Sequence, residues 1–273
     1  MSAVIIDTDK CKKDKLCVLE CPMKIIALNS DTGIPETIHN AENMCLDCGH
    51  CIAVCPYGAL SLTSMKTEEC QNVSPNWDPG IEIIENYFKA RRSIRRFKNK
   101  TVEKEILEKL IEITAYAPTG HNSRTVEYLI FTDKEIIKEL TLHVINWMRE
   151  MLNNAPDIGK SMHFDMITRA WALGVDVVMH NAPVVIVAHG NKNNPNTPTS
   201  CTIALAHLEL IAQAFGLGCC WAGYFTWCAM AYPPLRKALS IPDDNGIYGT
   251  MLTGYPIAKY YRIPKRKALV EWR

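Results

Sequence analysis

Apolar residues recur at helical spacing in two segments that flank a basic run. A helix is expected over 81–90, because its apolar side chains fall on one face: Ile81, Ile84 and Phe88. A second helix is expected over 101–117, with Thr101 as its N-cap and Pro118 as the residue that stops it. The apolar face of that helix consists of Ile106, Leu107, Leu110, Ile111 and Thr114.

Shorter apolar runs downstream predict strands. These runs cover 126–131, 184–188 and 247–252. Helical spacing returns between and after them, at 134–152, 163–180, 200–215 and 233–240. A few strands alternating with helices predict an α+β domain whose helices pack over a sheet.

The segment 210–235 contains no charged residue and is long enough to cross a bilayer, which takes about 20 apolar residues. Several glycines, the pair Pro233 and Pro234, and polar Gln213 interrupt it. We therefore expect a helix end and a loop buried in protein, and no membrane partner. The first residues carry neither a basic region nor a long apolar run, so no secretory signal is expected and the predicted location is cytoplasmic.

The composition is that of a folded protein. A chain of 273 residues suggests about two domains. With 48% hydrophobic and 22% charged residues, it has enough apolar material for a core. The formal net charge is only +1, which argues against nucleic acid as a partner, because nucleic-acid-binding domains are usually clearly basic.

Twelve cysteines point to metal binding rather than to disulfides, since no secretory signal is expected. The segments 11–22 and 45–56 share one pattern at a constant offset of 34 residues. In the second segment, three closely spaced cysteines precede a fourth, the spacing by which bacterial ferredoxins bind two iron–sulfur clusters. A zinc site fits less well, because zinc sites usually pair two ligand couples. Residues 1–65 therefore resemble a two-cluster bacterial-type ferredoxin domain.

This resemblance divides the ligands into two sets. A [4Fe–4S] cluster is expected on Cys21, Cys45, Cys48 and Cys51, and a second cluster on Cys11, Cys17 and Cys55. Asp14 occupies the position of the missing eighth cysteine, and a carboxylate is a harder ligand than a thiolate. Three alternatives remain: an Asp-ligated [4Fe–4S] cluster, a [3Fe–4S] cluster, or a surface aspartate above a three-iron cluster. Cys70, just beyond this domain, is a less favoured candidate for the missing ligand.

The other cysteines are expected to be buried small hydrophobic residues: Cys70, Cys201, Cys219, Cys220 and Cys228. Residues 66–80 are rich in turn formers and predict a linker. The run 89–100 then holds seven cations in twelve residues. By itself this run fits a solvated helix end, a nucleic-acid patch or a phosphate site, because arginine and a hydroxyl satisfy a phosphate by charge-assisted hydrogen bonds.

Five motifs that follow one another along the chain favour the phosphate site among these interpretations of the basic run. They are Arg91-Arg92-Ser93-Ile94-Arg95, then 117–123, 216–223, 254–256 and 265–267. Together they resemble the FMN-binding nitroreductase family over residues 81–273. The resemblance implies a nitroreductase-like α+β FMN domain behind the small ferredoxin-like domain.

The resemblance also implies roles for single residues. It assigns the FMN phosphate and ribityl chain to Arg91, Arg92 and Ser93, and the flavin N1–C2=O edge to Arg95. A loop that reaches the flavin from the second subunit corresponds to Pro118, Thr119, Gly120 and Asn122. The resemblance also implies that Trp221, Ala222 and Gly223 contact the ring through their backbone. It implies that Lys265 and Lys267 contact the phosphate. The step Arg124-Thr125-Val126 departs from the Gln-Pro-Trp of many members, which leaves the nicotinamide or substrate side unassigned.

The combination implies an FMN-dependent oxidoreductase in which the clusters exchange electrons with the flavin. No catalytic side chain is expected, because flavin N5 carries the chemistry. A homodimer, an external ferredoxin or NAD(P)H as electron donor, and a small organic acceptor are implied as partners. Two rivals remain: a non-catalytic electron carrier or redox sensor, and another flavin reaction such as reductive dehalogenation or flavin fragmentation.

Overall fold

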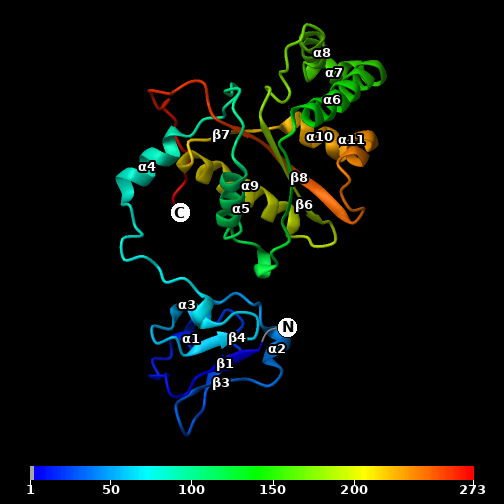
Figure 1. Ribbon diagram of the computed structural model, residues 1–273. Helices are drawn as coiled ribbons and strands as arrows, with labels where there is room; N and C mark the ends of the chain where they lie inside the picture. Colours follow the sequence, from blue (N-terminus) through cyan, green and yellow to red (C-terminus); the bar gives the residue numbers. More distant parts are fainter. Residues whose placement is uncertain (1–2) are drawn as a thin grey trace. The chain divides into compact units, whose positions relative to one another are not determined.

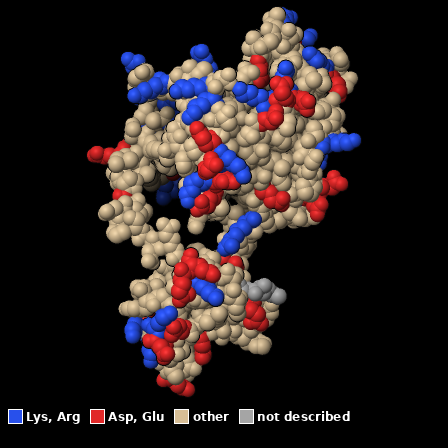
Figure 2. Space-filling model, in the orientation of Figure 1, with Lys and Arg blue, Asp and Glu red and all other residues tan. Residues whose placement is uncertain are grey.

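The computed structural model describes residues 3–273. Met1 and Ser2 lie outside the described part; they belong to the predicted first domain and to the segment in which a secretory signal was sought. The chain divides into two compact units (Figure 1). The first contains the residues up to Pro79 together with His121–Ser123, and the second contains Gly80–Gly120 and Arg124–Arg273. Side chains of both charge signs are interspersed over the visible face of each unit (Figure 2).

The first unit consists of two small antiparallel strand pairs and short helices. Strand β1 (Val4–Ile6) pairs with β4 (Leu60–Leu62), and β2 (Ile26–Leu28) pairs with β3 (Pro35–Thr37). The helices are α1 (Leu16–Glu20), α2 (Ala41–Met44), α3 (His50–Val54) and the 3₁₀ turn η1 (Thr67–Glu69). Its small core contains both cysteine and aliphatic side chains, Cys17 and Ile52 among them.

The sequence repeat of this unit is also a backbone repeat. Left-handed residues occur in pairs that are 34 positions apart: Lys13 and Asp47, Lys15 and Gly49, Lys24 and Gly58. The second pair immediately precedes α1 and α3, which are offset by the same 34 residues. Each segment therefore turns in the same way around its cysteines.

A four-stranded antiparallel sheet organises the second unit, in the order β5-β6-β8-β7. These strands are β5 (Glu127–Phe131), β6 (Val184–Asn191), β8 (Asn245–Gly254) and β7 (Gly218–Trp221). The central strand β6 alternates between two cores, as a strand covered on both faces must. Val185 and Val187 belong to one core, and Val184 and Ile186 belong to the other.

Helices cover both faces of this sheet (Figure 1). One core contains residues of α6 (Lys134–Asn154), α8 (Phe164–Ala172), α10 (Gly223–Ala231) and α11 (Pro233–Ala238). The other contains residues of α5 (Lys104–Thr114) and α9 (Thr197–Ala214). The remaining helices are α4 (Ile81–Ala90), α7 (Pro156–Ser161) and the short η2 (Gly120–Asn122). The prediction of helices packed over a sheet is confirmed.

Several element boundaries differ from those expected. Helix α5 starts at Lys104 with Glu103 as its N-cap, so the assignment of Thr101 was wrong. The helix expected over 163–180 ends at Ala172, because the chain turns at Gly174 (φ +80°) and the Asp176 carboxylate then accepts backbone N–H groups of the next turn.

The uncharged segment 210–235 contains two elements that were not predicted, β7 and α10. Gly216 (φ +69°) ends the run of α9, and β7 begins at Gly218. The segment is partly buried: Phe225 lies in the core, whereas Trp227 and Met230 are exposed. In the described part of the chain, none of the helices combines the length and the apolar character that crossing a bilayer requires.

Candidate functional site

Four cysteines surround one small cavity in the first unit. Cys21, Cys45, Cys48 and Cys51 line it together with aliphatic side chains such as Ile25. They are the four residues predicted to bind one cluster, brought together from both halves of the repeat. Soft thiolate donors in an apolar enclosure fit an iron–sulfur cluster.

The Cys51 thiol experiences this environment most strongly. Burial, together with the nearby Cys48, Cys45 and Cys21, raises its pKa to about 11. A metal-bound cysteine must lose its proton. Without iron the site therefore favours the protonated Cys51 thiol, and a bound cluster would supply positive charge that stabilises its thiolate.

The second predicted ligand set also converges. Burial raises the pKa of Cys17, and three groups around it add to this effect: Asp14, Cys11 and Cys55. Oδ1 of Asp14 accepts a hydrogen bond from the backbone N–H of Leu16 at 3.1 Å, at the start of α1. The backbone N–H of Ala59 donates to Sγ of Cys55 at 3.4 Å. Across residues 3–273, no three His, Cys, Asp or Glu side chains form a group that could hold a single metal ion.

The five other cysteines divide by burial. Cys201, Cys219, Cys220 and Cys228 are buried, as predicted. Cys70 is exposed, and its thiol donates to the carbonyl oxygen of Lys66 at 3.5 Å. The expectation that Cys70 is a buried hydrophobic residue was therefore wrong, because it follows a 3₁₀ turn at the surface of the first unit.

A cationic cavity of about 450 Å³ lies in the second unit, between the end of α4 and the C-terminal segment. Phe88 and Ile263 supply apolar wall. Its cationic side chains are Lys89, Arg91, Arg92, Lys265 and Arg266. Three residues predicted to bind the FMN phosphate thus share one cavity, whereas Lys267 is not among its lining residues.

Two of the three arginines of this cavity, Arg91 and Arg92, donate hydrogen bonds to other groups of the protein. Nη1 of Arg91 donates to Oε1 of Glu209 at 2.6 Å. Nη1 of Arg92 donates to the carbonyl oxygens of Lys89, at 3.0 Å, and of Arg91, near the C-terminus of α4. Guanidinium groups fixed in this way lose little conformational freedom when a phosphate binds. The donor set fits the phosphate of a nucleotide.

The residues predicted to contact the flavin ring lie at the edge strand β7. The backbone N–H of Ile94 donates to the carbonyl oxygen of Cys219 at 2.8 Å, so the segment containing Ser93 and Arg95 runs beside this strand. Arg95 is exposed. Burial raises the pKa of Cys220, and the nearby Arg95 opposes that rise.

Trp221 and Ala222 follow at the end of β7, where the backbone N–H of Ala222 donates to the carbonyl oxygen of Thr250 at 2.9 Å. Nε1 of Trp221 donates to Oε2 of Glu209 at 3.3 Å. A Cβ on Gly223 would have no neighbour within 4 Å, so the backbone at the start of α10 is open. Glu209 thereby links Trp221 to Arg91.

The predicted second-subunit loop does not line the cationic cavity. A Cβ on Gly120 would lie 2.5 Å from Cγ of Asn196, so any larger residue there would displace the Asn196 side chain. Oγ1 of Thr119 accepts from the backbone N–H of Arg124 at 3.1 Å, which closes the loop that begins at Pro118. Asn122 belongs to the first unit, where its Nδ2 donates to the carbonyl oxygens of Leu46 and Asp47.

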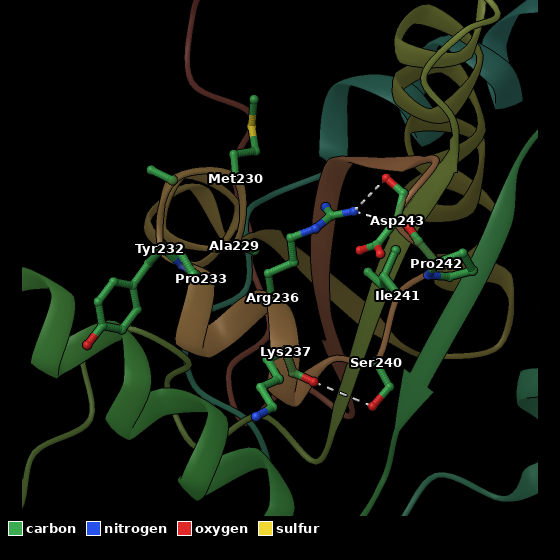
Figure 3. A pocket seen from close by; sticks show the side chains of 11 residues that line it. Ala229, Met230, Tyr232, Pro233, Arg236, Lys237, Ser240, Ile241, Pro242 and Asp243 are labelled. Carbon is green, nitrogen blue, oxygen red and sulfur yellow. Dashed lines mark hydrogen bonds between the residues drawn. The ribbon is translucent and has the colours of Figure 1, made fainter.

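A third cavity, of about 540 Å³, lies between α10, α11 and the turn before β8 (Figure 3). Its arginine, Arg236, donates to the carbonyl oxygens of Pro242 at 3.1 Å and Asn245 at 2.7 Å. The guanidinium is thus occupied in holding the turn. None of the predicted site residues lines this cavity, and we assign its arginine a structural role.

Comparison with known proteins decides the family. The nitroreductase family profile matches residues 88–255, which is more than half of the chain. The chain belongs to the nitroreductase family. The family profile of a 4Fe-4S dicluster domain matches residues 9–59, which precede the nitroreductase match in the sequence. The predicted resemblance is confirmed for both parts.

Individual relatives of the nitroreductase domain are distant. A Methanothermobacter thermautotrophicus protein, provisionally named NADH dehydrogenase/NAD(P)H nitroreductase, is 22% identical over 64% of this chain and 78% of its own length. The iodotyrosine deiodinase of Thermotoga neapolitana is 20% identical over 70% of this chain and 98% of its own length. The crystal structure of a Bacteroides fragilis nitroreductase with bound FMN has a TM-score of 0.59 at 20% identity, covering 70% of this chain and all of that one. It shows the shared nitroreductase fold.

Sequence reasoning missed Glu209 of the nitroreductase domain. A signal was present, because Glu209 is the one residue among Asp, Glu, Lys and Arg within Thr197–Ala214. A carboxylate in such a helix is seldom buried without a partner. Its partners, Arg91 and Trp221, are distant in sequence, and only the fold identifies them.

Proposed function

We propose that this nitroreductase-family chain is an FMN-dependent oxidoreductase that moves electrons between two iron–sulfur clusters, FMN and a small organic acceptor. One observation carries the proposal: the chain combines a four-thiol cavity with a cationic cavity, the two binding environments that an electron path from cluster to flavin requires. We assign the clusters to residues 1–65, the linker to 66–80 and FMN to 81–273.

Each predicted group has a residue set that fits it. Cys21, Cys45, Cys48 and Cys51 would hold a [4Fe–4S] cluster. Cys11, Cys17 and Cys55 would hold the second cluster, with Asp14 at its fourth corner as either a ligand or the neighbour of a missing iron. Arg91, Arg92 and Lys265 would hold the FMN phosphate. FMN supplies two-electron chemistry and clusters supply single electrons.

Apolar side chains that the described chain leaves exposed support a homodimer. On α4 and in the C-terminal segment these include Ile81, Phe88, Leu269 and Trp272, with Leu269 96% exposed. Exposed apolar groups of this size mark an interaction surface. Light scattering should give twice the mass of the 30.8 kDa chain, and a flavin-bearing monomer would contradict this assignment.

The electron donor is tested by anaerobic reduction of the holoprotein with NADH, NADPH or reduced ferredoxin, followed at the flavin absorbance. Bleaching by reduced ferredoxin alone makes the clusters the entry port. Direct bleaching by a pyridine nucleotide indicates outward flow through the clusters. Failure of all three donors, with FMN and iron bound, would contradict the proposed enzyme and favour an electron carrier or sensor.

Reductive dehalogenation is a second candidate, favoured by the similarity to the Thermotoga neapolitana iodotyrosine deiodinase over 98% of that protein. Product analysis separates the two reactions. A halogenated aromatic should release halide if this candidate is right, whereas a nitroaromatic or quinone should be reduced if the first is.

A further inference from the structure

A single buried carboxylate connects two predicted FMN contacts. Glu209 is 7% exposed, and its neighbours Leu205, Leu208 and Ala212 on α9 are completely buried. Removing a carboxylate from water is costly unless it is paired and hydrogen-bonded. The position of Glu209 therefore depends on its partners.

Both carboxylate oxygens are engaged, each by a different element. Oε1 accepts from Nη1 of Arg91 at 2.6 Å, and Oε2 accepts from Nε1 of Trp221 at 3.3 Å. Arg91 follows α4 and lines the cationic cavity. Trp221 ends β7 and is 38% exposed. One side chain thus fixes a cation of the cavity and an aromatic ring of the edge strand.

We propose that Glu209 is a positioning residue that gives the site its preference for a phosphorylated flavin over an unphosphorylated one. This inference rests on the proposed function. Arg91 is 25% exposed at its side chain, so it faces the cavity while Glu209 fixes one of its nitrogens. An arginine that is already ordered before the ligand binds loses less conformational entropy on binding. This strengthens the binding of the group that the arginine contacts, which is the phosphate.

Charge alone would produce a different result. If Glu209 acted only by neutralising Arg91, its removal would increase the positive charge in the cavity and strengthen phosphate binding. If Glu209 served only to stabilise the fold, its removal would weaken phosphorylated and unphosphorylated flavins alike. Positioning weakens the phosphorylated one selectively.

The test measures binding of FMN and riboflavin to the iron-loaded, flavin-free full chain by flavin fluorescence. The proteins are the wild type, Glu209→Gln, Arg91→Gln and the double variant. Glu112→Gln is the matched control, because Glu112 is an exposed glutamate that pairs with Lys109 on α5. In Glu209→Gln we expect the FMN Kd to rise about tenfold while the riboflavin Kd changes less than about twofold. The double variant should bind FMN no more weakly than Arg91→Gln, since the two residues act as one unit.

Equal loss of FMN and riboflavin affinity in Glu209→Gln, tighter FMN binding, or full additivity with Arg91→Gln would overturn the inference. If Glu209→Gln does not fold, Arg91→Lys answers the question, because it keeps the charge but removes the planar fork. That variant should lose FMN preference over riboflavin, and retention of the preference would overturn the inference. A wild-type protein that binds neither flavin would overturn the proposed function as well.

Discussion

Lys15 and Gly49 occupy equivalent left-handed positions, with φ of 66° and 71°, directly before α1 and α3. A lysine in this conformation is strained relative to glycine. Both halves of the repeat share this backbone conformation, although only the second has glycine there. The residues just before them, Asp14 and Cys48, are equivalent in turn, and they are the one ligand position at which the two halves differ.

Asp14→Cys restores the missing thiolate and should convert the second cluster into a firmly held [4Fe–4S] cluster, because thiolate binds iron more strongly than carboxylate. We expect the iron content to rise, or the bound iron to be retained better on exposure to air. The EPR signal of a three-iron cluster, where wild type has one, should disappear. Iron analysis and EPR of the oxidised and reduced protein check this. Signals and iron content identical to wild type would remove any special role of Asp14.

Neutralising the cavity cations of the C-terminal segment should weaken FMN binding. Lys265→Gln combined with Arg266→Gln removes two charges from the cavity wall, and we expect the FMN Kd to rise about tenfold or more. Lys267→Gln is the matched control, since Lys267 does not line the cavity, and it should change the Kd less than about twofold. A larger effect of Lys267→Gln than of the pair would show that the segment closes differently on the phosphate.

Two glycines near β7 should differ in their tolerance of a methyl group. A Cβ on Gly218 would overlap Cγ1 of Ile94, whereas a Cβ on Gly223 would meet nothing within 4 Å. Gly218→Ala should lower the free energy of unfolding by about 1–3 kcal/mol, and Gly223→Ala by less than about 0.5 kcal/mol. Urea denaturation measures both. Equal effects would contradict the packing of Ile94 against β7.

Acid should destabilise the protein through a buried histidine. Burial lowers the pKa of His189 below its usual 6.5, although Glu127 partly opposes this, and Nδ2 of Asn245 donates to its Nδ1 at 3.0 Å. Below pH 6.5 the unfolded chain binds the proton more readily, so the free energy of unfolding falls as the pH drops toward the lowered pKa. Between pH 7.5 and 5.5, wild type should lose up to about 1 kcal/mol more than His189→Gln. His207→Gln, at an exposed position, should behave like wild type.

The sequence was most informative where the spacing of residues of one type predicts a binding site or a strand. The grouping of Cys21 with the cysteines of the second segment around one cavity was predictable from their spacing, whereas the division of the cysteines into two ligand sets stays a prediction. The strands β5, β6 and β8 were predictable because each is an apolar run. The positions of Arg91, Arg92 and Lys265 around one cavity were expected only through the family resemblance.

Other features depend on contacts between distant segments. Strand β7 is only four residues long, and α10 is apolar on all sides, so neither has a periodic pattern. The link from Glu209 to Arg91 spans 118 positions. Local propensity contains no information about such a pair.

The most direct test of the account is whether electrons reach the flavin through the clusters. Cys45→Ser removes one thiol of the four-thiol cavity, and Cys70→Ser, at the exposed cysteine outside both proposed ligand sets, is the control. Anaerobic stopped-flow mixing with reduced ferredoxin should reduce FMN rapidly in wild type and in Cys70→Ser. In Cys45→Ser with FMN still bound, we expect reduction at least about 100-fold slower, because the protein controls the electron path only through bound clusters. Flavin reduction at the wild-type rate in Cys45→Ser would contradict the account.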